Sequence, residues 1–132
     1  MITLDTSGVI ALLNARDPDH EAARSALHQA GRPYLVPCGI LSETANLLET
    51  RMPLALDAFL ADLESGAFSQ DCGDDSLPRV RELVARYADL PLGYSDASVI
   101  ACAERNGRLV LTFDRRDFGV VAREGTIEIR PA

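Results

Sequence analysis

Apolar residues in this chain fall into two patterns, short continuous runs and stripes with helical spacing. The first run covers residues 1–4 and ends on Asp5, Thr6 and Ser7, three residue types that favour the start of a helix. Apolar positions then continue at helical spacing through residues 9–13. The opening therefore predicts a buried strand that leads into a helix, with Asp5 at the carboxyl end of the strand.

The same two patterns continue along the rest of the chain. Apolar runs predict further strands at residues 34–36, 67–70, 108–113 and 126–129, the last as an edge strand. Helical stripes predict helices at residues 20–30, 39–50, 54–63, 77–88 and 97–106, with a polar loop at residues 71–76. Asp19 is expected to cap the first of these helices, and Ser95 or Asp96 the last. Strands that alternate with helices predict an α/β fold with a central parallel sheet.

Four acidic residues lie beside apolar structure rather than on a polar face. Asp5 follows the first strand, and Asp114 follows the most apolar strand, with Asp117 one helical turn later. Glu43 lies in the apolar third helix, and Asp96 heads the most apolar helix. Because the carboxyl ends of parallel strands share one edge of a sheet, where open α/β folds bind ligands, we expect these acidic side chains to meet there.

Each of these residues also has an ordinary structural explanation. Asp96 could simply cap its helix, and Glu43 could belong to the solvated stripe of its helix. Asp114 and Asp117 could cap a turn or pair with the arginines beside them, whereas Asp5 is costly to bury unless it is paired or metal-bound. Carboxylates gathered in one cleft repel each other. A hard divalent cation such as Mg²⁺ or Mn²⁺, which prefers oxygen ligands, resolves that repulsion.

The composition limits what class of protein this is. The 132 residues fit one domain over residues 1–132, and 47% hydrophobic residues are too many for a disordered chain. No apolar run could span a membrane, and no basic segment precedes an apolar one at the N-terminus, so we expect a cytoplasmic protein. The cysteines Cys38, Cys72 and Cys102 form no C-x-x-C pair, which predicts reduced thiols, with Cys38 and Cys102 packed as small hydrophobic residues.

The charge balance separates several classes of function. The net charge of -7 argues against a protein that coats nucleic acid by surface charge alone. It does not exclude a metal-binding enzyme, because bound cations reverse the local sign. Receiver domains also bind Mg²⁺ at strand ends, but they need a lysine, and this chain has none. The haloacid-dehalogenase phosphatases need a second Asp two residues after the first, where this chain has Ser7.

The acidic residues belong to four short motifs. These are Asp5-Thr6-Ser7, Ser42-Glu43, Ser95-Asp96-Ala97-Ser98 and the stretch Leu111-Thr112-Phe113-Asp114-Arg115-Arg116-Asp117-Phe118. In order and approximate spacing they resemble the motifs of PIN-domain ribonucleases, and among them the VapC toxins of bacterial type II toxin–antitoxin pairs. Residues 87–93 and 103–107 strengthen the resemblance, which covers essentially the whole chain.

The resemblance implies a three-layer α/β/α PIN-like fold and Mg²⁺- or Mn²⁺-dependent cleavage of structured RNA by a metal-activated water. By the same resemblance, Asp5 and Asp96 are direct metal ligands. Glu43 and Asp114 complete the cluster through the metal or its bound water, and Asp117 is an auxiliary residue. Two alternatives stay open: a PIN-like domain that only binds without catalysis, and a nuclease outside any toxin–antitoxin pair.

Hydroxyl and guanidinium groups beside the carboxylates are candidates for substrate binding. Thr6, Ser7 and Thr112 could hydrogen-bond the carboxylates or a substrate phosphate, or serve as helix caps and turn bonds. Arg115 and Arg116, with Arg16 or Arg51, could make bidentate contacts to RNA phosphates. Alternatively, these arginines only balance a net acidic surface.

The resemblance also implies partners. We expect a VapB-like antitoxin whose C-terminal segment wraps a groove on the third and fourth helices and places a basic residue near Asp5, Asp96 or Asp114. The apolar residues of these two helices exceed what one helix face needs, although several must simply pack against the sheet: Leu47, Leu48, Leu54, Phe59, Leu60 and Leu63. A homodimer is expected on the resemblance alone.

Overall fold

The computed structural model describes residues 1–71 and 76–132 of the chain. Across these residues, five parallel strands form one sheet in the order β3-β2-β1-β4-β5. The strands are β1 (Ile2–Leu4), β2 (Tyr34–Pro37), β3 (Ser69–Asp71), β4 (Leu109–Leu111) and β5 (Glu128–Arg130). The predicted α/β class with a central parallel sheet is confirmed, and the last strand lies at an edge as predicted.

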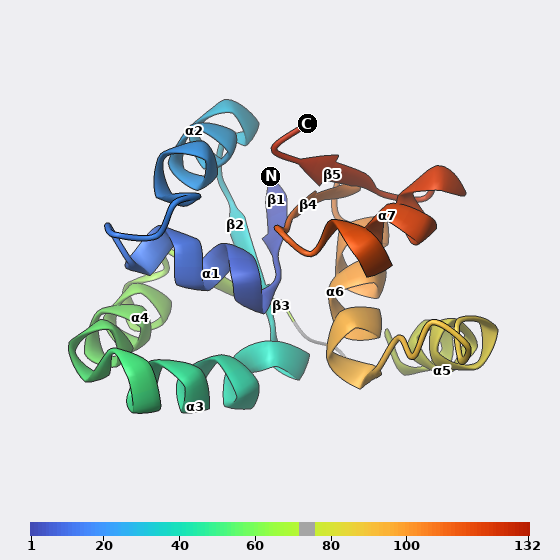
Figure 1. Ribbon diagram of the computed structural model, residues 1–132, viewed down its shortest axis with the longest axis horizontal. Helices are drawn as coiled ribbons and strands as arrows, with labels where there is room; N and C mark the ends of the chain where they lie inside the picture. Colours follow the sequence, from blue (N-terminus) through green and yellow to red (C-terminus); the bar gives the residue numbers. More distant parts are fainter. Residues whose placement is uncertain (72–75) are drawn as a thin grey trace.

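Helices cover both faces of this sheet. They are α1 (Thr6–Leu13), α2 (His20–Ala30), α3 (Leu41–Arg51), α4 (Pro53–Ser65), α5 (Leu77–Arg86), α6 (Tyr94–Arg105) and α7 (Arg115–Arg123), with a 3₁₀ turn, η1 (Cys38–Ile40), before α3. Helices α1 to α4 pack on one face and α5 to α7 on the other, which gives the predicted three-layer arrangement (Figure 1). Among the described residues, no helix is both long and apolar enough to cross a membrane.

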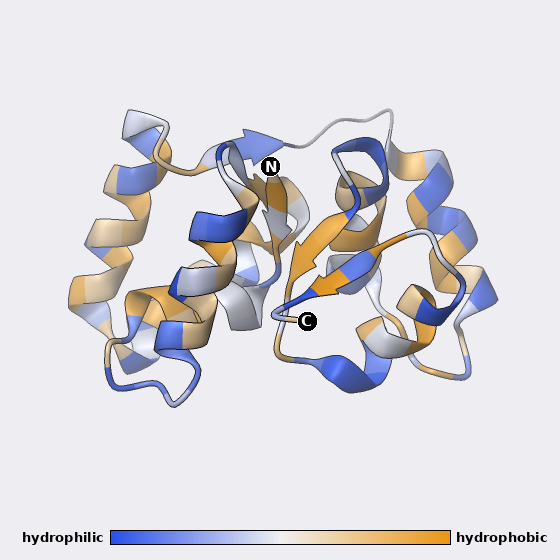
Figure 2. Cartoon of the chain, turned by 90° about the horizontal axis from the view of Figure 1, so that it is seen from above, coloured by the Kyte–Doolittle hydropathy of each residue, from blue (hydrophilic) through white to orange (hydrophobic). Residues whose placement is uncertain are grey.

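The core forms where the apolar runs of the sequence meet between the layers. Leu4 and Val110 on the central strands are completely buried. Helix α6, apolar nearly all round in the sequence, contributes the continuous buried segment of residues 99–103. In Figure 2 strand β4 is orange along its length, and helices flank the sheet on both sides. Burial of this apolar surface is the main force that holds the three layers together.

The helices differ from the sequence prediction in three local details. Helix α6 begins at Tyr94, and Gly93 is its N-cap, because the carbonyl of Gly93 already accepts a hydrogen bond from the Ala97 N–H at 3.0 Å. Ser95 and Asp96 therefore do not cap it. Asp19 is the N-cap residue of α2 as predicted, but its side chain makes no capping hydrogen bond. Helix α7 was not predicted, because its sequence is mostly charged and it buries only Phe118 and Val121.

The cysteines differ from the sequence prediction at one position. Cys38 is disulfide-bonded, so the prediction of a reduced thiol is wrong there. Cys72, and the part of the predicted polar loop at residues 72–75, lie outside the described residues. Cys102 is a free thiol with 2% of its surface exposed, so the prediction that it packs as a small hydrophobic residue is confirmed.

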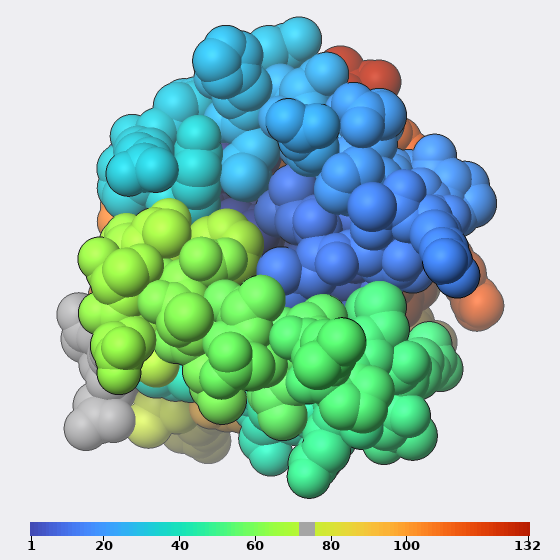
Figure 3. Space-filling model, turned by 90° about the vertical axis from the view of Figure 1, so that its left-hand side faces the viewer, coloured from blue at the N-terminus to red at the C-terminus, as the bar shows by residue number. Residues whose placement is uncertain are grey.

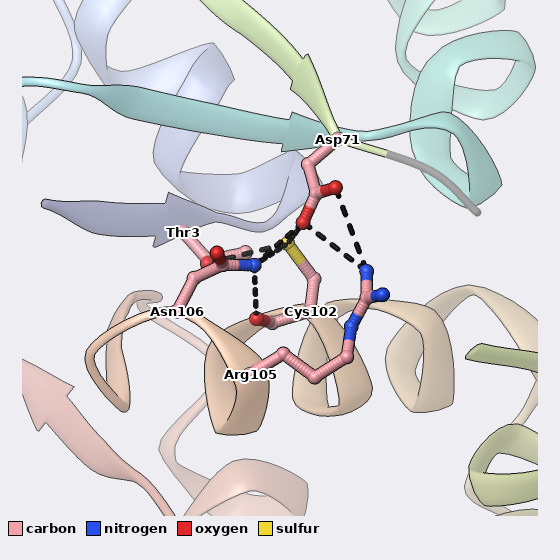
Figure 4. A network of polar contacts seen from close by, with 5 residues as sticks. All are labelled: Thr3, Asp71, Cys102, Arg105 and Asn106. Atoms are coloured by element: carbon pink, nitrogen blue, oxygen red, sulfur yellow. Dashed lines mark hydrogen bonds and ion pairs between the residues drawn. The ribbon is translucent and has the colours of Figure 1, made fainter. Parts of the chain in front are cut away.

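A polar network connects strand β3 to helix α6 (Figure 4). The Asp71 carboxylate accepts hydrogen bonds from the Asn106 amide at 2.6 Å and the Cys102 thiol at 3.1 Å, and pairs with Arg105 at 3.3 Å. Burial raises the pKa of the Cys102 thiol to about 12, so this sulfur stays protonated and unreactive. The charge of the Asp71 carboxylate is therefore compensated by hydrogen-bond donors and a cation from α6 and the residue that follows it.

Candidate metal centre

The sheet places the first and last acidic motifs side by side. Strands β1 and β4 are parallel neighbours, with Leu4 opposite Leu111, so both strands end at the same edge of the sheet. The Asp5 N–H donates to the Leu111 carbonyl at 3.2 Å. Helix α1 can approach β4 because residue 8 is glycine, where an added Cβ would lie 2.7 Å from the Leu111 carbonyl oxygen. The strand order reverses between β1 and β4, which is the position where parallel α/β sheets bind ligands.

Asp5 is held rigidly at this edge. Asp5 is 5% exposed. It is the N-cap of α1, and its carboxylate accepts a hydrogen bond from the Gly8 N–H at 2.8 Å. The Ser7 hydroxyl donates to the same carboxylate oxygen at 2.7 Å, and the Thr112 hydroxyl donates to the other oxygen. These three donors fix the orientation of the carboxylate before any ligand arrives.

The hydroxyls of Ser7 and Thr112 therefore take the first of their predicted roles. Each hydroxyl has one proton, and both protons point to Asp5. Their oxygens also accept hydrogen bonds from the backbone N–H groups of Phe113 at 2.9 Å and Asp114 at 3.0 Å, which shapes the turn after β4. The Thr6 hydroxyl points elsewhere, 3.2 Å from that of Thr44 on α3.

Three carboxylates form the tightest part of the acidic cluster. One oxygen each from Asp96, Asp114 and Asp117 lies within 4.8 Å of the others, and all three residues are half-buried. Asp96 projects from the first turn of α6. Asp114 is the N-cap of α7 and accepts a hydrogen bond from the Asp117 N–H at 3.4 Å. The capping role expected as an alternative for Asp114 therefore coexists with its place in the cluster.

A cleft of about 360 Å³ extends from this cluster toward α3. Asp5, Asp96 and Asp114 line it on one side, and the exposed Glu43 joins them from the first turn of α3. Sequence reasoning did not single out other residues of the cleft, because they belong to no acidic motif or, like Phe113, are apolar members of one. They are Ile10 and Ala11 of α1, Asp17 and Asp19 of the loop before α2, Ile40, and Phe113.

The charges of the cluster act on one another. Burial, as the largest cause, and then the charges of Asp114, Asp5, Asp117 and Glu43, in that order, together raise the pKa of Asp96 to about 6. Burial also raises the pKa of Asp5 to about 6, against the three hydrogen bonds that lower it. All five predicted acidic residues therefore contribute to one negative field at this edge of the sheet.

The donor set fits a hard divalent cation. Within residues 1–71 and 76–132, Asp5, Asp96 and Asp114 form no ion pair with a basic side chain. Arg116 approaches Asp117 only to 3.9 Å, with 85% of its side chain exposed. Carboxylate oxygens with no counter-charge are the ligands that Mg²⁺ and Mn²⁺ prefer. The close trio includes Asp117, to which the sequence assigned an auxiliary role, whereas the oxygens of Asp5 are already bonded to protein donors.

The arginines expected to contact substrate lie in different places. Arg115 donates to the Pro131 carbonyl at 2.7 Å, and neither Arg115 nor Arg116 lines the cleft. Arg51, at the last turn of α3, does line it, while Arg16 does not.

Comparisons with known proteins agree with this geometry. The PIN domain family matches residues 2–124. Ribonuclease VapC26 from Mycobacterium tuberculosis (strain ATCC 25618 / H37Rv) is 30% identical over 121 residues, which are 89% of this chain and 90% of that protein. Most of the chain, including all five acidic positions, therefore falls within the matched family region.

Solved structures share the fold along nearly their whole length. The crystal structure of VapC20 from Mycobacterium tuberculosis, described as a toxin that cleaves the sarcin–ricin loop, has a TM-score of 0.78 and 26% identity, covering 99% of this chain and 100% of that one. A toxin–antitoxin complex from Klebsiella pneumoniae has a TM-score of 0.72 at 19% identity, covering 97% and 96%. VapBC2 from Rickettsia felis, bound to a promoter DNA fragment, has a TM-score of 0.70 at 14% identity, covering 98% of both chains.

Proposed function

Because the chain belongs to the PIN-domain family, and within it to the VapC ribonucleases, we propose that it is a metal-dependent endoribonuclease and the toxin of a type II toxin–antitoxin module. The observation that carries this proposal is the trio Asp96, Asp114 and Asp117, whose oxygens converge beside a cleft with the exposed Arg116, 3.9 Å from Asp117, as the single basic partner among the described residues. We propose further that residues 1–132 act as a single cytoplasmic PIN domain.

The residues have separate roles in this proposal. Asp96, Asp114 and Asp117 would hold Mg²⁺ or Mn²⁺, with Asp5 beside them, and Glu43 on α3 would orient a water from within the same cleft. A bound divalent ion supplies a water of lowered pKa and stabilises charge on the phosphate. Ser7 and Thr112 hold the Asp5 carboxylate in one orientation, and residues of α1 and the turn after β4 exclude bulk solvent from the far side of the cluster.

Cleavage of RNA by the purified protein tests this proposal. With Mn²⁺ or Mg²⁺, a long structured RNA should be cut internally, and EDTA should stop the reaction. Asp96→Asn should remain folded, as measured by circular dichroism, while cleavage is lost. A contaminating nuclease would cut equally in preparations of wild type and Asp96→Asn. A non-catalytic PIN-like binding module would bind the RNA without releasing fragments in any divalent metal.

The antitoxin is a separate part of the proposal, supported by the exposed apolar residues of α4. Leu54 is 91% exposed and Leu60 is 50% exposed, whereas Leu48 and Phe59, from the same predicted groove, are buried in the core. Figure 3 shows the face formed by α1, α2, α3 and α4, on which the outer side of α4 is exposed. An amphipathic segment of the antitoxin covers this face, and a basic residue beyond that segment reaches the acidic cluster.

Co-expression with the product of the neighbouring gene tests the partner. The two proteins should co-purify, the ribonuclease activity should fall, and growth arrest caused by this protein alone should be relieved. The double variant Leu54→Glu/Leu60→Glu should weaken the complex and leave cleavage of RNA unchanged. If expression is harmless and the neighbouring product neither binds nor inhibits, the protein is a nuclease outside a toxin–antitoxin pair.

A homodimer is the last part of the proposal. The exposed apolar residues Leu77 and Val84 of α5, with Tyr94 at the start of α6, line one hollow and give a surface for a second copy. Light scattering should give twice the mass of the 14.3 kDa chain. Val84→Arg should return the mass to that of one chain, because a charge would be buried without a partner.

A further inference from the structure

Helix α3 carries three side chains that line the cleft at regular spacing. Glu43, Leu47 and Arg51 are four residues apart, so they lie on one helix face, one above the other. The helical rise places the backbone of Arg51 about 12 Å from that of Glu43. The stripe therefore begins with the acidic residue nearest the metal centre and ends with a cation well away from it.

Arg51 is a basic residue in a cleft whose other charged residues are acidic. Asp5, Asp17, Asp19, Glu43, Asp96 and Asp114 line the cleft with Arg51, which is the single basic residue among the described residues that do so. An RNA strand is a polyanion, and the metal compensates the carboxylates only at one end of the cleft. The remaining acidic lining, which includes Asp17 and Asp19, repels the other phosphates of the strand, and Arg51 is the group that can receive one of them.

The guanidinium of Arg51 is exposed, and within the described part of the chain it makes no ion pair or side-chain hydrogen bond. Arg24, Arg79, Arg86 and Arg130 instead hold carboxylates of the protein itself. The five N–H donors of Arg51 are therefore available, and their planar arrangement matches a phosphate.

We propose that Arg51 binds a backbone phosphate of the substrate RNA other than the scissile one, and that Leu47 contacts the intervening nucleotide. This inference rests on the proposed ribonuclease function and adds a substrate-positioning residue to it. The stripe of Glu43, Leu47 and Arg51 then sets the direction in which the RNA strand crosses the site.

Steady-state cleavage of a short fluorescent RNA tests the role of Arg51. Arg51→Ala should raise KM about tenfold and leave kcat within about twofold, because the lost contact is made equally in the ground and transition states. The slope of log kcat/KM against log salt should fall by about 0.7, the value for one phosphate on a single strand. Arg51→Lys should restore the salt slope and recover only part of KM, because a lysine keeps the charge without the bidentate contact.

Arg123→Ala is the matched control. Arg123 is an exposed arginine at the far end of α7, also without a partner among the described residues, and it does not line the cleft. Its removal changes net charge equally, so it should leave KM and the salt slope at wild-type values. Equal effects of Arg51→Ala and Arg123→Ala would overturn the proposal, as would a fall in kcat without a change in KM.

Replacing single RNA phosphates with neutral analogues identifies which phosphate Arg51 contacts. In a series of RNAs with one methylphosphonate at successive positions, one substitution beyond the scissile bond should raise KM for wild type and have no further effect in Arg51→Ala. Full additivity at every position would overturn the proposal. If wild type itself cuts no RNA in Mn²⁺, the proposed function fails first. If wild type cuts and Arg51→Ala behaves as wild type, only this inference fails.

Discussion

Asp5 and Asp71 occupy comparable places in the sheet and have opposite surroundings. Asp5 follows β1 and Asp71 ends β3, so both lie at the carboxyl edge of the same parallel sheet. Asp71 faces Arg105, Asn106 and Cys102, which supply a cation and two neutral donors (Figure 4). Asp5 receives three neutral donors but has Asp114 and Asp96 nearby and no basic partner among the described residues.

The difference lies in where the compensating charge comes from. The charge of Asp71 is compensated by the protein, so its network joins β3 to α6 and requires nothing from outside. The charges around Asp5 are not compensated, and the fold keeps them together at a cost in stability. That cost is explained if an external cation binds there, because binding to the folded state alone restores the stability.

The largest expected effect separates the two regions by activity. Asp96→Asn should lower kcat/KM for RNA cleavage by at least about 100-fold, because a metal ligand is neutralised without loss of volume. Asn106→Ala, which removes a donor from Asp71, should leave kcat/KM within about twofold. The measurement is the initial cleavage rate in Mn²⁺. Similar losses in the two variants would mean that the acidic cluster has no special role in the chemistry.

The pH dependence of stability should also differ between metal-free and metal-bound protein. The pKa of Asp5 is about 6 in the fold and 3.8 in the unfolded chain, so the folded state holds the extra proton between these values. In EDTA, stability should therefore fall as pH rises from about 4 to about 7, by up to about 3 kcal/mol from Asp5. With Mn²⁺ the slope should reverse, because the metal binds the deprotonated carboxylates.

Urea unfolding at several pH values measures this dependence. In EDTA, Asp5→Asn should reduce the loss of stability between pH 4 and pH 7, since asparagine does not titrate. A metal-free wild type whose stability rises between pH 4 and pH 7 would show that the carboxylates are compensated within the fold, as Asp71 is.

A smaller effect concerns the structural region. Asn106→Ala should lower the free energy of unfolding by about 1–3 kcal/mol, because the half-buried Asp71 carboxylate loses its shortest hydrogen bond. In EDTA, Asp96→Asn should change stability in the opposite direction, since it removes repulsion from four neighbouring carboxylates. Denaturant unfolding at pH 7 measures the change in the free energy of unfolding for each variant and so compares their directions. Destabilisation by both variants would remove the distinction drawn between the regions.

The sequence predicted the elements that depend on local pattern and missed those that depend on distant partners. The order of apolar runs and stripes was enough for the parallel sheet and for Asp5 at its edge. The start of α6 was misplaced because Ser95 and Asp96 are good caps by residue type, while Gly93 takes that place through its extended backbone. The hydrogen bond from Thr112 to Asp5 joins residues 107 positions apart, which no local pattern encodes.

The role of Asp71 shows the same limit. In the sequence it began a polar loop, and only the pairing of β3 with β2 brings it beside α6. Conversely, the four acidic motifs could be recognised together because each follows or heads an apolar element. The closeness of Asp117 to Asp96 could not be predicted, since it depends on the turn between β4 and α7.

Anomalous diffraction from crystals grown with Mn²⁺ would show directly whether the acidic cluster binds a metal. We expect one or more peaks among Asp96, Asp114 and Asp117, at about 2.0–2.2 Å from their oxygens, and none at Asp71. Asp96→Asn crystals should show the peak weakened or lost. A protein that cleaves RNA in Mn²⁺ but shows no peak at the trio, or binds the ion at Asp71 instead, would contradict the account.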